Sequence, residues 1–234
     1  DDRLGGLLMY GVPQMKLEKQ IIERRIQLMK EEGIQFYTNV HVGKDLTKEE
    51  LLQDYDAIVL CCGAKKARDL NVVGREAKGI YFAVDFLKST TQDILNQTSF
   101  RIDAKGKHVV VVGGGDTGND CVGTCIRQGC ASVTQLEMMP SPPHQNTRPW
   151  PMWPDGLRTD YGQEESQVVF KKDPRVYATT IKECIEEDGQ LKAVKTIQGR
   201  MVDGQWVEKE DSEKMLKADL LLIAAGFVGI EDDI

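Results

Sequence analysis

Three glycines at fixed spacing, Gly113, Gly115 and Gly118, carry the clearest chemical signal in this sequence. They follow an apolar, strand-like run (109–112) and open a helical stretch that extends to about residue 128. In that setting the first glycine permits a tight turn, the second lets a pyrophosphate approach the backbone, and the third lets helix and strand pack closely. The free N–H groups at the helix start then face the anion. The pattern therefore predicts a dinucleotide site.

An acidic residue, Glu137, ends the next strand-like run, about 20 residues beyond the last glycine. A carboxylate at this place accepts hydrogen bonds from the ribose 2′-hydroxyl of NAD and repels the 2′-phosphate of NADP, so we expect NAD(H) to be favoured over NADP(H). Two alternatives stay open: Arg148 or Arg158 folds back on a 2′-phosphate, or Glu137 is only a solvated strand end. The other residues expected at the pyrophosphate turn are Gly114, Asp116 and Thr117.

The composition is that of a globular protein and argues against several classes of partner. Of the 234 residues 41% are hydrophobic, enough for one large domain or two small ones, and the formal net charge is −7. Nucleic acids and anionic membranes require basic surface, so neither is an expected partner. No apolar run approaches the roughly 18 residues of a membrane span, and the N-terminus lacks the order of a signal peptide. We expect a cytoplasmic protein.

Thiols and imidazoles show no arrangement that indicates chemistry. The six cysteines form no C-x-x-C pair, so neither zinc nor a redox dithiol is indicated. Cys121 and Cys125 share one face of the helix after the glycines, and we expect them to be buried against the sheet rather than reactive. The three histidines have no carboxylate or cysteine at the spacing of a metal site or triad. No catalytic acid or base and no metal ligand is predicted.

Periodicity and turn signals predict the remaining elements. Before the glycine motif we expect an amphipathic helix ending at Gly33, a half-buried strand over 34–42, a short helix opened by the capping box 47–50, a buried strand over 56–62 and a helix within 80–96. After it, short strands separated by two Asp-Gly turns predict a β-meander over 176–208, and a buried strand covers 218–225. Between these regions a loop of about twenty residues holds six of the eight prolines together with Trp150 and Trp153. A loop of that length usually has a function.

Two distant segments, 56–64 and 218–226, share one plan: an acidic start, an apolar strand, then small residues and glycine. Small residues at the carboxyl end of a parallel strand let a ligand approach the backbone, and open α/β sheets bind ligands at that edge. Each segment alone also fits a buried strand that ends in a glycine turn. Their positions on either side of the glycine motif favour ligand contact at both glycine ends.

Four segments together resemble the small (beta) subunit of glutamate synthase and related flavoprotein reductases that bind two dinucleotides: 5–13, 113–120, 149–154 and 218–229. The resemblance extends over essentially the whole chain. It implies an α/β fold, a Rossmann-like three-layer ββα sandwich, in which an NAD(P)H-binding domain is inserted in an FAD-binding domain of similar fold. The implied boundaries are residues 1–84 for a partial FAD-binding domain, 85–225 for the NAD(P)H-binding domain and 226–234 for the start of the return to the FAD domain.

The resemblance also implies an activity, the transfer of hydride from NAD(P)H to FAD. Electrons then pass through iron–sulfur clusters to the glutamate synthase large (alpha) subunit, which makes glutamate from 2-oxoglutarate and glutamine. Because nicotinamide and flavin carry this chemistry themselves, no catalytic residue is required of the protein. The residues implied to line the cofactor site in an intact subunit are Gly5, Gly6, Leu7, Gly63, Ala64 and Gly226.

Some parts of the family pattern are not in this sequence. The resemblance implies that the FAD pyrophosphate fingerprint and the cysteine-rich iron–sulfur region precede this segment and that a Gly-Asp flavin motif follows it. We therefore expect a complete NAD(P)H-binding domain with incomplete FAD-domain flanks, and FAD binding is expected of the intact subunit rather than of this chain alone. Two other functions stay open: the reductase module of a bifurcating or pyrimidine-reducing flavoprotein, and a nucleotide-binding or docking module without activity. The loop with Trp150 and Trp153 favours glutamate synthase.

Overall fold

The computed structural model describes residues 1–230 and divides the chain into two compact units. We name the units by their place in the sequence: the inner unit is contiguous, Asp69–Ala224, and the outer unit consists of the flanking segments, Asp1–Arg68 and the chain from Ala225 onward. The last four residues of the segment expected at 226–234 lie outside the described part of the chain. None of the helices in residues 1–230 has the length and hydropathy of a membrane span.

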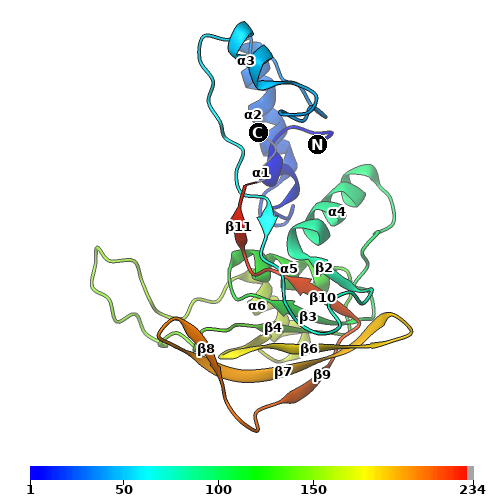
Figure 1. Ribbon diagram of the computed structural model, residues 1–234, viewed down its shortest axis with the longest axis vertical. Helices are drawn as coiled ribbons and strands as arrows, with labels where there is room; N and C mark the ends of the chain where they lie inside the picture. The colour runs from blue at the N-terminus through cyan, green and yellow to red at the C-terminus, as the bar shows by residue number, and fades with distance from the viewer. Residues whose placement is uncertain (231–234) are drawn as a thin grey trace. The chain divides into compact units, whose positions relative to one another are not determined.

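The inner unit is built on a five-stranded parallel sheet in the order β2-β10-β3-β4-β5. These strands are β2 (Ile80–Phe82), β3 (His108–Val112), β4 (Ser132–Leu136), β5 (Arg175–Val176) and β10 (Leu220–Ile223). Figure 1 labels β2, β10, β3 and β4 of this sheet. Of these five strands β10 comes last in the sequence, but it lies between β2 and β3 in the sheet and pairs with both. All four of its residues are buried, which agrees with the continuous apolar run and with a parallel sheet that is covered on both faces.

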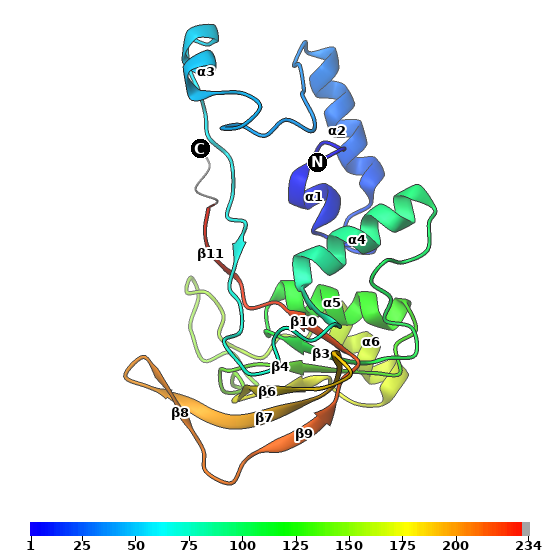
Figure 2. The ribbon, with the colours of Figure 1, turned by 45° about the vertical axis from the view of Figure 1, so that its right-hand side comes forward.

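Three helices cover one face of this sheet: α4 (Ala83–Asn96), α5 (Asp116–Arg127) and α6 (Tyr161–Phe170), as Figure 2 shows. The core between the helices and the sheet contains Phe86 from α4, Cys121 and Cys125 from α5, Val111 from β3 and Leu222 from β10. The two cysteines are buried as predicted, and burial raises the pKa of each thiol. They therefore act as small apolar side chains.

The other face is covered by an antiparallel meander of β6 (Thr179–Glu187), β7 (Gln190–Val202), β8 (Gln205–Glu208) and β9 (Lys214–Lys217). The predicted Asp-Gly turns join its strands, with φ of 53° and 72° at Asp188 and Gly189 and of 49° and 80° at Asp203 and Gly204. Two successive positive φ values give the turn whose twist suits a two-residue hairpin. The helices, the parallel sheet and the meander form the predicted three-layer ββα sandwich.

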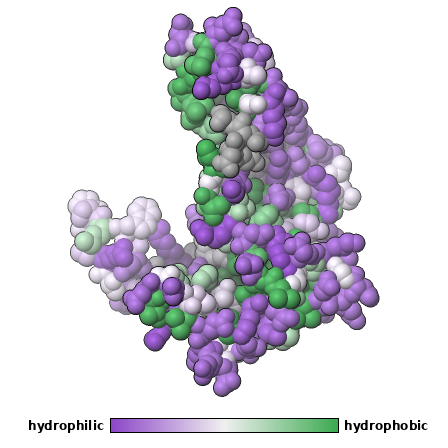
Figure 3. Space-filling model, viewed as in Figure 1, coloured by the Kyte–Doolittle hydropathy of each residue, from purple (hydrophilic) through white to green (hydrophobic). Residues whose placement is uncertain are grey.

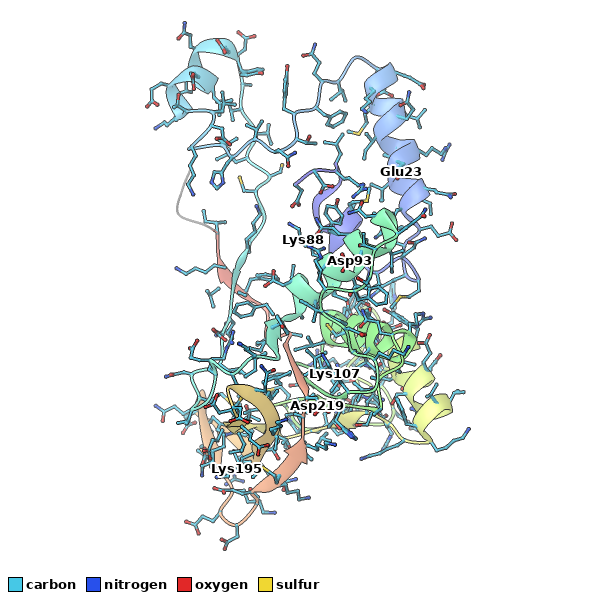
Figure 4. The ribbon with its side chains drawn as sticks, turned by 90° about the vertical axis from the view of Figure 1, so that its right-hand side faces the viewer. Glu23, Lys88, Asp93, Lys107, Lys195 and Asp219 are labelled. Atoms are coloured by element: carbon cyan, nitrogen blue, oxygen red, sulfur yellow. The ribbon has the colours of Figure 1, made fainter. Side chains whose placement is uncertain are left out.

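An acidic side chain joins the starts of the two central strands. The backbone N–H of His108 donates to Oδ2 of Asp219 over 2.8 Å, and the N–H of Asp219 donates to the carbonyl of His108 over 2.8 Å. Asp219 is labelled in Figure 4, at the start of β10. The acidic start of the segment 218–226 therefore ties β10 to the start of β3.

The inner unit begins earlier than residue 85, the boundary implied by the resemblance. Residues 69–84 belong to it because their backbone bonds to the meander and the sheet. The N–H of Cys184 donates to the carbonyl oxygen of Val73 over 2.8 Å, and the N–H of Leu191 donates to the carbonyl oxygen of Lys78 over 2.9 Å. At Gly74 an added Cβ would lie 2.0 Å from the carbonyl oxygen of Cys184, so this segment packs directly on β6.

The outer unit holds three helices, α1 (Gly6–Tyr10), α2 (Lys19–Glu31) and α3 (Lys48–Asp54), and a two-stranded antiparallel ribbon of β1 (Lys66–Ala67) and β11 (Phe227–Gly229). The predicted capping box is present at α3, where the Glu50 N–H donates to Oγ1 of Thr47 over 3.3 Å. Lys19 is buried and donates to the carbonyls of Leu8 and Val12, and burial lowers its pKa. This lysine therefore ties α1 to the start of α2.

Two strands predicted for the outer unit, 34–42 and 56–62, are absent from the structure. Within residues 34–42 the β-pairing is limited to an isolated bridge between Val42 and Leu46, and residues 56–62 pair with no strand in the described part of the chain. Val59 is 84% exposed, and Cys61 and Cys62 are exposed as well. Figure 3 has the same view as Figure 1, and apolar residues lie on its surface where Figure 1 draws the part of the chain that follows α3. An apolar alternating segment forms a strand only where a neighbour completes its hydrogen bonds.

The packing of α4 predicts a large stability effect for one aromatic residue. Phe86 is fully buried in the core between the helices and the sheet. Phe86→Ala should lower the free energy of unfolding by about 3–5 kcal/mol, because it leaves a cavity in that core. Urea denaturation followed by circular dichroism measures the change. Phe100→Ala is the matched control because Phe100 is 36% exposed, and a loss at Phe86 no larger than at Phe100 would contradict the described packing.

Candidate functional site

The glycine motif forms the turn between β3 and α5. Gly113 has φ 121°, and a Cβ there would lie 2.2 Å from the carbonyl oxygen of Ala224, which follows β10. A backbone hydrogen bond fixes Ala224 beside this turn, since its N–H donates to the carbonyl oxygen of Val112 over 2.7 Å. Only glycine combines this φ with so close a neighbour. The turn is therefore fixed against the ends of the two central strands.

Gly118 and Gly115 serve different purposes in the turn. A Cβ at Gly118 would lie 2.1 Å from the carbonyl oxygen of Gly113, so α5 packs its first turn directly on the glycine turn. Gly115 is the N-cap of α5 and has no atom within 4 Å of the position of its Cβ. No side chain caps this helix, and the first N–H groups of a helix have no acceptor within it. The open space at Gly115 is thus bordered by the free donors of a helix N-terminus.

Asp116 and Thr117 are the first two residues of α5, as the motif predicted. Asp116 is exposed and is the acidic residue of the first turn, while Thr117 is half-buried. The structure brings both residues, together with Gly114, to the same turn.

Glu137 lies directly after β4 and is folded against the glycine turn. Its Oε2 accepts a hydrogen bond from the N–H of Gly114 over 2.8 Å, and its Oε1 accepts one from the N–H of Met139 over 2.7 Å. A Cβ on Gly114 would lie 2.1 Å from Oε2. Glu137 is thus half-buried, and both of its carboxylate oxygens accept hydrogen bonds from the backbone.

The proline-rich loop, residues 138–160, is organised by its own side chains. Asp155 accepts from the N–H of Thr147 over 2.8 Å and from its hydroxyl over 2.5 Å, and these bonds hold the pKa of Asp155 below its usual value. Arg148 lies 3.6 Å from Asp155, and Arg158 lies 5.3 Å above the ring of Trp153. Both arginines suggested for a 2′-phosphate are therefore engaged within the loop.

Three buried polar residues at this site were not singled out from the sequence: Asn119, Gln135 and Gln163. The side-chain amide of Gln135 donates to the carbonyl of Gly113 over 2.9 Å, and that of Gln163 donates to Oε1 of Gln135 over 3.2 Å. Oδ1 of Asn119 accepts from the N–H groups of Gly162 and Gln163, at the start of α6. The glutamine near the end of the strand-like segment 132–136 and the Asp160–Gln163 capping box were the signals that could have indicated this network.

The outer unit holds the residues that the resemblance assigns to a flavin. Gly5, Gly6, Gly63 and Gly226 have φ of 110°, 53°, 67° and 83°, and an added Cβ at the last three would meet no atom within 4 Å. A Cβ at Gly5 would lie 2.9 Å from the Ile22 side chain, so this glycine permits packing against α2. Leu7 and Ala64 are exposed. The segment 63–68 runs beside Gly226, whose carbonyl accepts from the N–H of Arg68 over 2.9 Å.

Metal or thiol chemistry has no support in the described residues. Within 1–230 no three His, Cys, Asp or Glu side chains are grouped as metal ligands would be. Cys61 and Cys62 are exposed, whereas the other four cysteines are buried. Burial raises the pKa of Cys130 to about 11.

Comparison with known proteins places this geometry in a family. Residues 13–232 match the family model described as pyridine nucleotide-disulphide oxidoreductase. The chain belongs to this oxidoreductase family. Its glycine turn and its inner unit are the parts expected of an enzyme that uses a pyridine nucleotide.

Among its relatives, "Glutamate synthase [NADH]" of Schizosaccharomyces pombe is 46% identical over 244 residues, which cover 99% of this chain and 12% of that protein. "Glutamate synthase [NADPH] small chain" of Bacillus subtilis is 45% identical over 242 residues, 98% of this chain and 49% of that protein. The oxidoreductase chain thus spans about half the length of this small-chain relative and about an eighth of the longer one.

A solved structure of the same fold is that of Mycobacterium tuberculosis FprA in complex with NADPH. It superimposes with a TM-score of 0.67 at 18% sequence identity, covering 97% of this oxidoreductase chain and 62% of that one. At this identity the likeness concerns the fold alone.

Substitutions at Gly115, the N-cap of α5, and at Gly118, within α5, should have opposite effects on binding and on stability. Gly115→Ala should leave the free energy of unfolding within about 1 kcal/mol of the unmodified protein but weaken nucleotide binding more than about tenfold, because a methyl group enters the open space. Gly118→Ala should instead destabilise the fold by about 3 kcal/mol through the clash with Gly113. Calorimetric titration with NADH and thermal unfolding measure the two effects.

Gly229→Ala is the control for these substitutions, because Gly229 also has open space around it and lies in the outer unit. It should change neither quantity. If Gly115→Ala binds NADH as well as the unmodified chain does, the assignment of the open space to the pyrophosphate is wrong.

Proposed function

We propose that the chain binds a nicotinamide dinucleotide at the turn 113–118 and is the pyridine-nucleotide end of an electron-transferring flavoprotein. The observation that carries the proposal is the open, uncapped N-terminus of α5 beside a turn in which side chains are excluded. Such a helix end offers N–H donors and a positive dipole to a pyrophosphate. The residues present thus fit the group, with Gly115, Asp116 and Thr117 around the phosphates.

Glu137 supports NAD(H) rather than NADP(H) as the nucleotide. Its oxygens are aligned by the N–H groups of Gly114 and Met139, and each keeps a lone pair for a ribose hydroxyl. A 2′-phosphate at the same place would meet a carboxylate, whereas Arg148 pairs with Asp155 and Arg158 lies over Trp153 in this structure. The names of relatives include both NADH and NADPH, so the site itself carries this part of the proposal.

The outer unit supplies part of the surface for the flavin in the intact protein. Gly6, Gly63 and Gly226 combine positive φ with open space, which permits close approach of a cofactor to the backbone. Gly5, Leu7 and Ala64 complete the proposed flavin-binding set. When bound, the reduced nicotinamide supplies a hydride that the flavin accepts, and the protein contributes orientation and electrostatics.

The whole protein is proposed to make glutamate. The names of its relatives, including small chains of glutamate synthase, support a role in delivering electrons through iron–sulfur clusters to a large subunit that uses glutamine and 2-oxoglutarate. The chain itself would then be the entry point for electrons, with the clusters and the amide chemistry in other parts of the assembly.

Charge at residue 137 should set the nucleotide preference. Glu137→Gln keeps an acceptor for the N–H of Gly114 but removes the charge, so NADH binding should weaken about tenfold while NADPH binding stays equal or improves. Quenching or enhancement of nucleotide fluorescence gives both dissociation constants. Glu187→Gln, at an exposed strand end, is the control. Tighter binding of NADPH than NADH by the unmodified chain would overturn the assignment of Glu137 to a ribose.

The electron-transfer role is tested on the intact protein that contains this chain. It should carry flavin absorbance that one equivalent of NADH bleaches, and with the large subunit it should oxidise NADH continuously only when glutamine and 2-oxoglutarate are both present. Binding of NADH without bleaching would mean a docking module. Bleaching without glutamate formation would mean a reductase of another kind.

A further inference from the structure

One peptide plane in the glycine turn, between Gly113 and Gly114, is held from both sides. Its carbonyl oxygen accepts from Nε2 of Gln135 over 2.9 Å, and its N–H donates to Oε2 of Glu137 over 2.8 Å. Both side chains come from one short stretch, the end of β4. The two contacts therefore fix the direction in which this peptide points.

A glycine turn needs such a constraint. Gly113, Gly114 and Gly115 follow one another, and a peptide flanked by glycines can turn over without steric cost from side chains. In the orientation present, the carbonyl of Gly113 points to the buried amide of Gln135, whose residue is 0% exposed. The inverted peptide would turn this carbonyl dipole away from its donor and towards the phosphate side, where an acceptor repels an anion.

The amide of Gln135 is itself oriented by α6. Nε2 of Gln163 donates to Oε1 of Gln135 over 3.2 Å, which leaves the amino group of Gln135 to face Gly113. Oε1 of Gln163 in turn accepts from the N–H of Asp160 over 2.8 Å. A Cβ on Gly118 would lie 2.6 Å from Nε2 of Gln135, so the amide fills the space between the turn and the first turn of α5.

Asn119 anchors the same end of α6. Its Oδ1 accepts from Gly162 over 3.0 Å and from Gln163 over 3.2 Å, and its Nδ2 is buried with no hydrogen-bond partner in residues 1–230. An amide buried with one group unpaired is costly, and the two bonds that Oδ1 makes to the helix start offset part of that cost. α6 is thereby held where Gln163 reaches Gln135.

We propose that Gln135 is a positioning residue for the dinucleotide, which acts through the backbone of Gly113 and not by touching the ligand. It holds the turn in the orientation that receives a pyrophosphate. The inference rests on the proposed nucleotide site. Because the pyrophosphate is common to both nucleotides, Gln135 should affect NADH and NADPH equally, in contrast to Glu137.

The test uses three variants of the 234-residue chain. Gln135→Leu removes the donor to Gly113 and should weaken NADH, NADPH and ADP-ribose by the same factor, about tenfold, with adenosine binding unchanged. Gln163→Leu removes the bond to Oε1 of Gln135, but the carbonyl of Gly113 by itself still favours the amino group of Gln135 on its side. Affinity should therefore stay within about threefold of the unmodified chain. The double variant removes both amides, which should recover much of the stability lost in Gln135→Leu but none of the affinity.

Calorimetric titration and thermal unfolding of each variant separate positioning from folding. Hydrogen exchange at the Gly114 amide gives a further readout, and it should become faster in Gln135→Leu and stay slow in Gln163→Leu. If affinity follows thermal stability across the three variants, Gln135 is only a structural residue and the proposal is overturned. If the unmodified chain binds no nucleotide, the proposed function fails instead, and the two failures are thereby distinguished.

Discussion

The close approach of α5 to the end of β3 is the constraint on which the rest of this site depends. Two backbone contacts define it, at Gly113 against Ala224 and at Gly118 against Gly113, and in each a Cβ would stand little more than 2 Å from a carbonyl oxygen. Because the helix begins so close to the strand end, its free N–H groups lie beside the open space at Gly115. A side chain at Gly118 would push the helix away from the turn, and one at Gly113 would clash with the chain after β10, so either would disturb that arrangement.

The layers around this contact explain why it can be maintained. Buried strands β3 and β10 end side by side, so the carbonyl of Ala224 limits Gly113 from one direction, while Gln135 and Glu137 limit the next peptide from β4. The meander covers the second face of the sheet and allows every residue of β10 to be apolar. The turn is thus held by structure on three sides and remains open on the side where a ligand would enter.

Much of the inner unit could be predicted from the sequence because its signals are local. The glycine motif, the Asp-Gly turns and the apolar run of β10 each specify a conformation within a few residues. α6 was missed because its start follows a proline-rich loop and its sequence, with Gly162 and two adjacent valines, is a weak helix pattern. Gln135 was missed because its importance depends on Gly113, which is near it in space but far from it in sequence.

The outer unit shows the opposite case. The segments 34–42 and 56–62 have the composition of strands, but a strand exists only through its neighbours, and none of the described residues pairs with them along their length. The helices of this unit were easier to predict, since a capping box such as that at Thr47 acts within one turn. The start of the compact inner unit at Asp69 could not be predicted for a related reason: backbone bonds from Val73 and Lys78 to the meander cannot be read from local sequence.

The central claim is that a dinucleotide binds through its pyrophosphate at the N-terminus of α5. Amide chemical shifts of the isotope-labelled chain, followed as ADP-ribose is added, test it most directly. We predict saturable shifts that are largest at Gly115, Asp116 and Thr117 and are accompanied by smaller shifts at Gly114 and Met139, whose N–H groups bond Glu137. Saturable shifts confined to other parts of the chain, or no binding of ADP-ribose at all, would contradict the account.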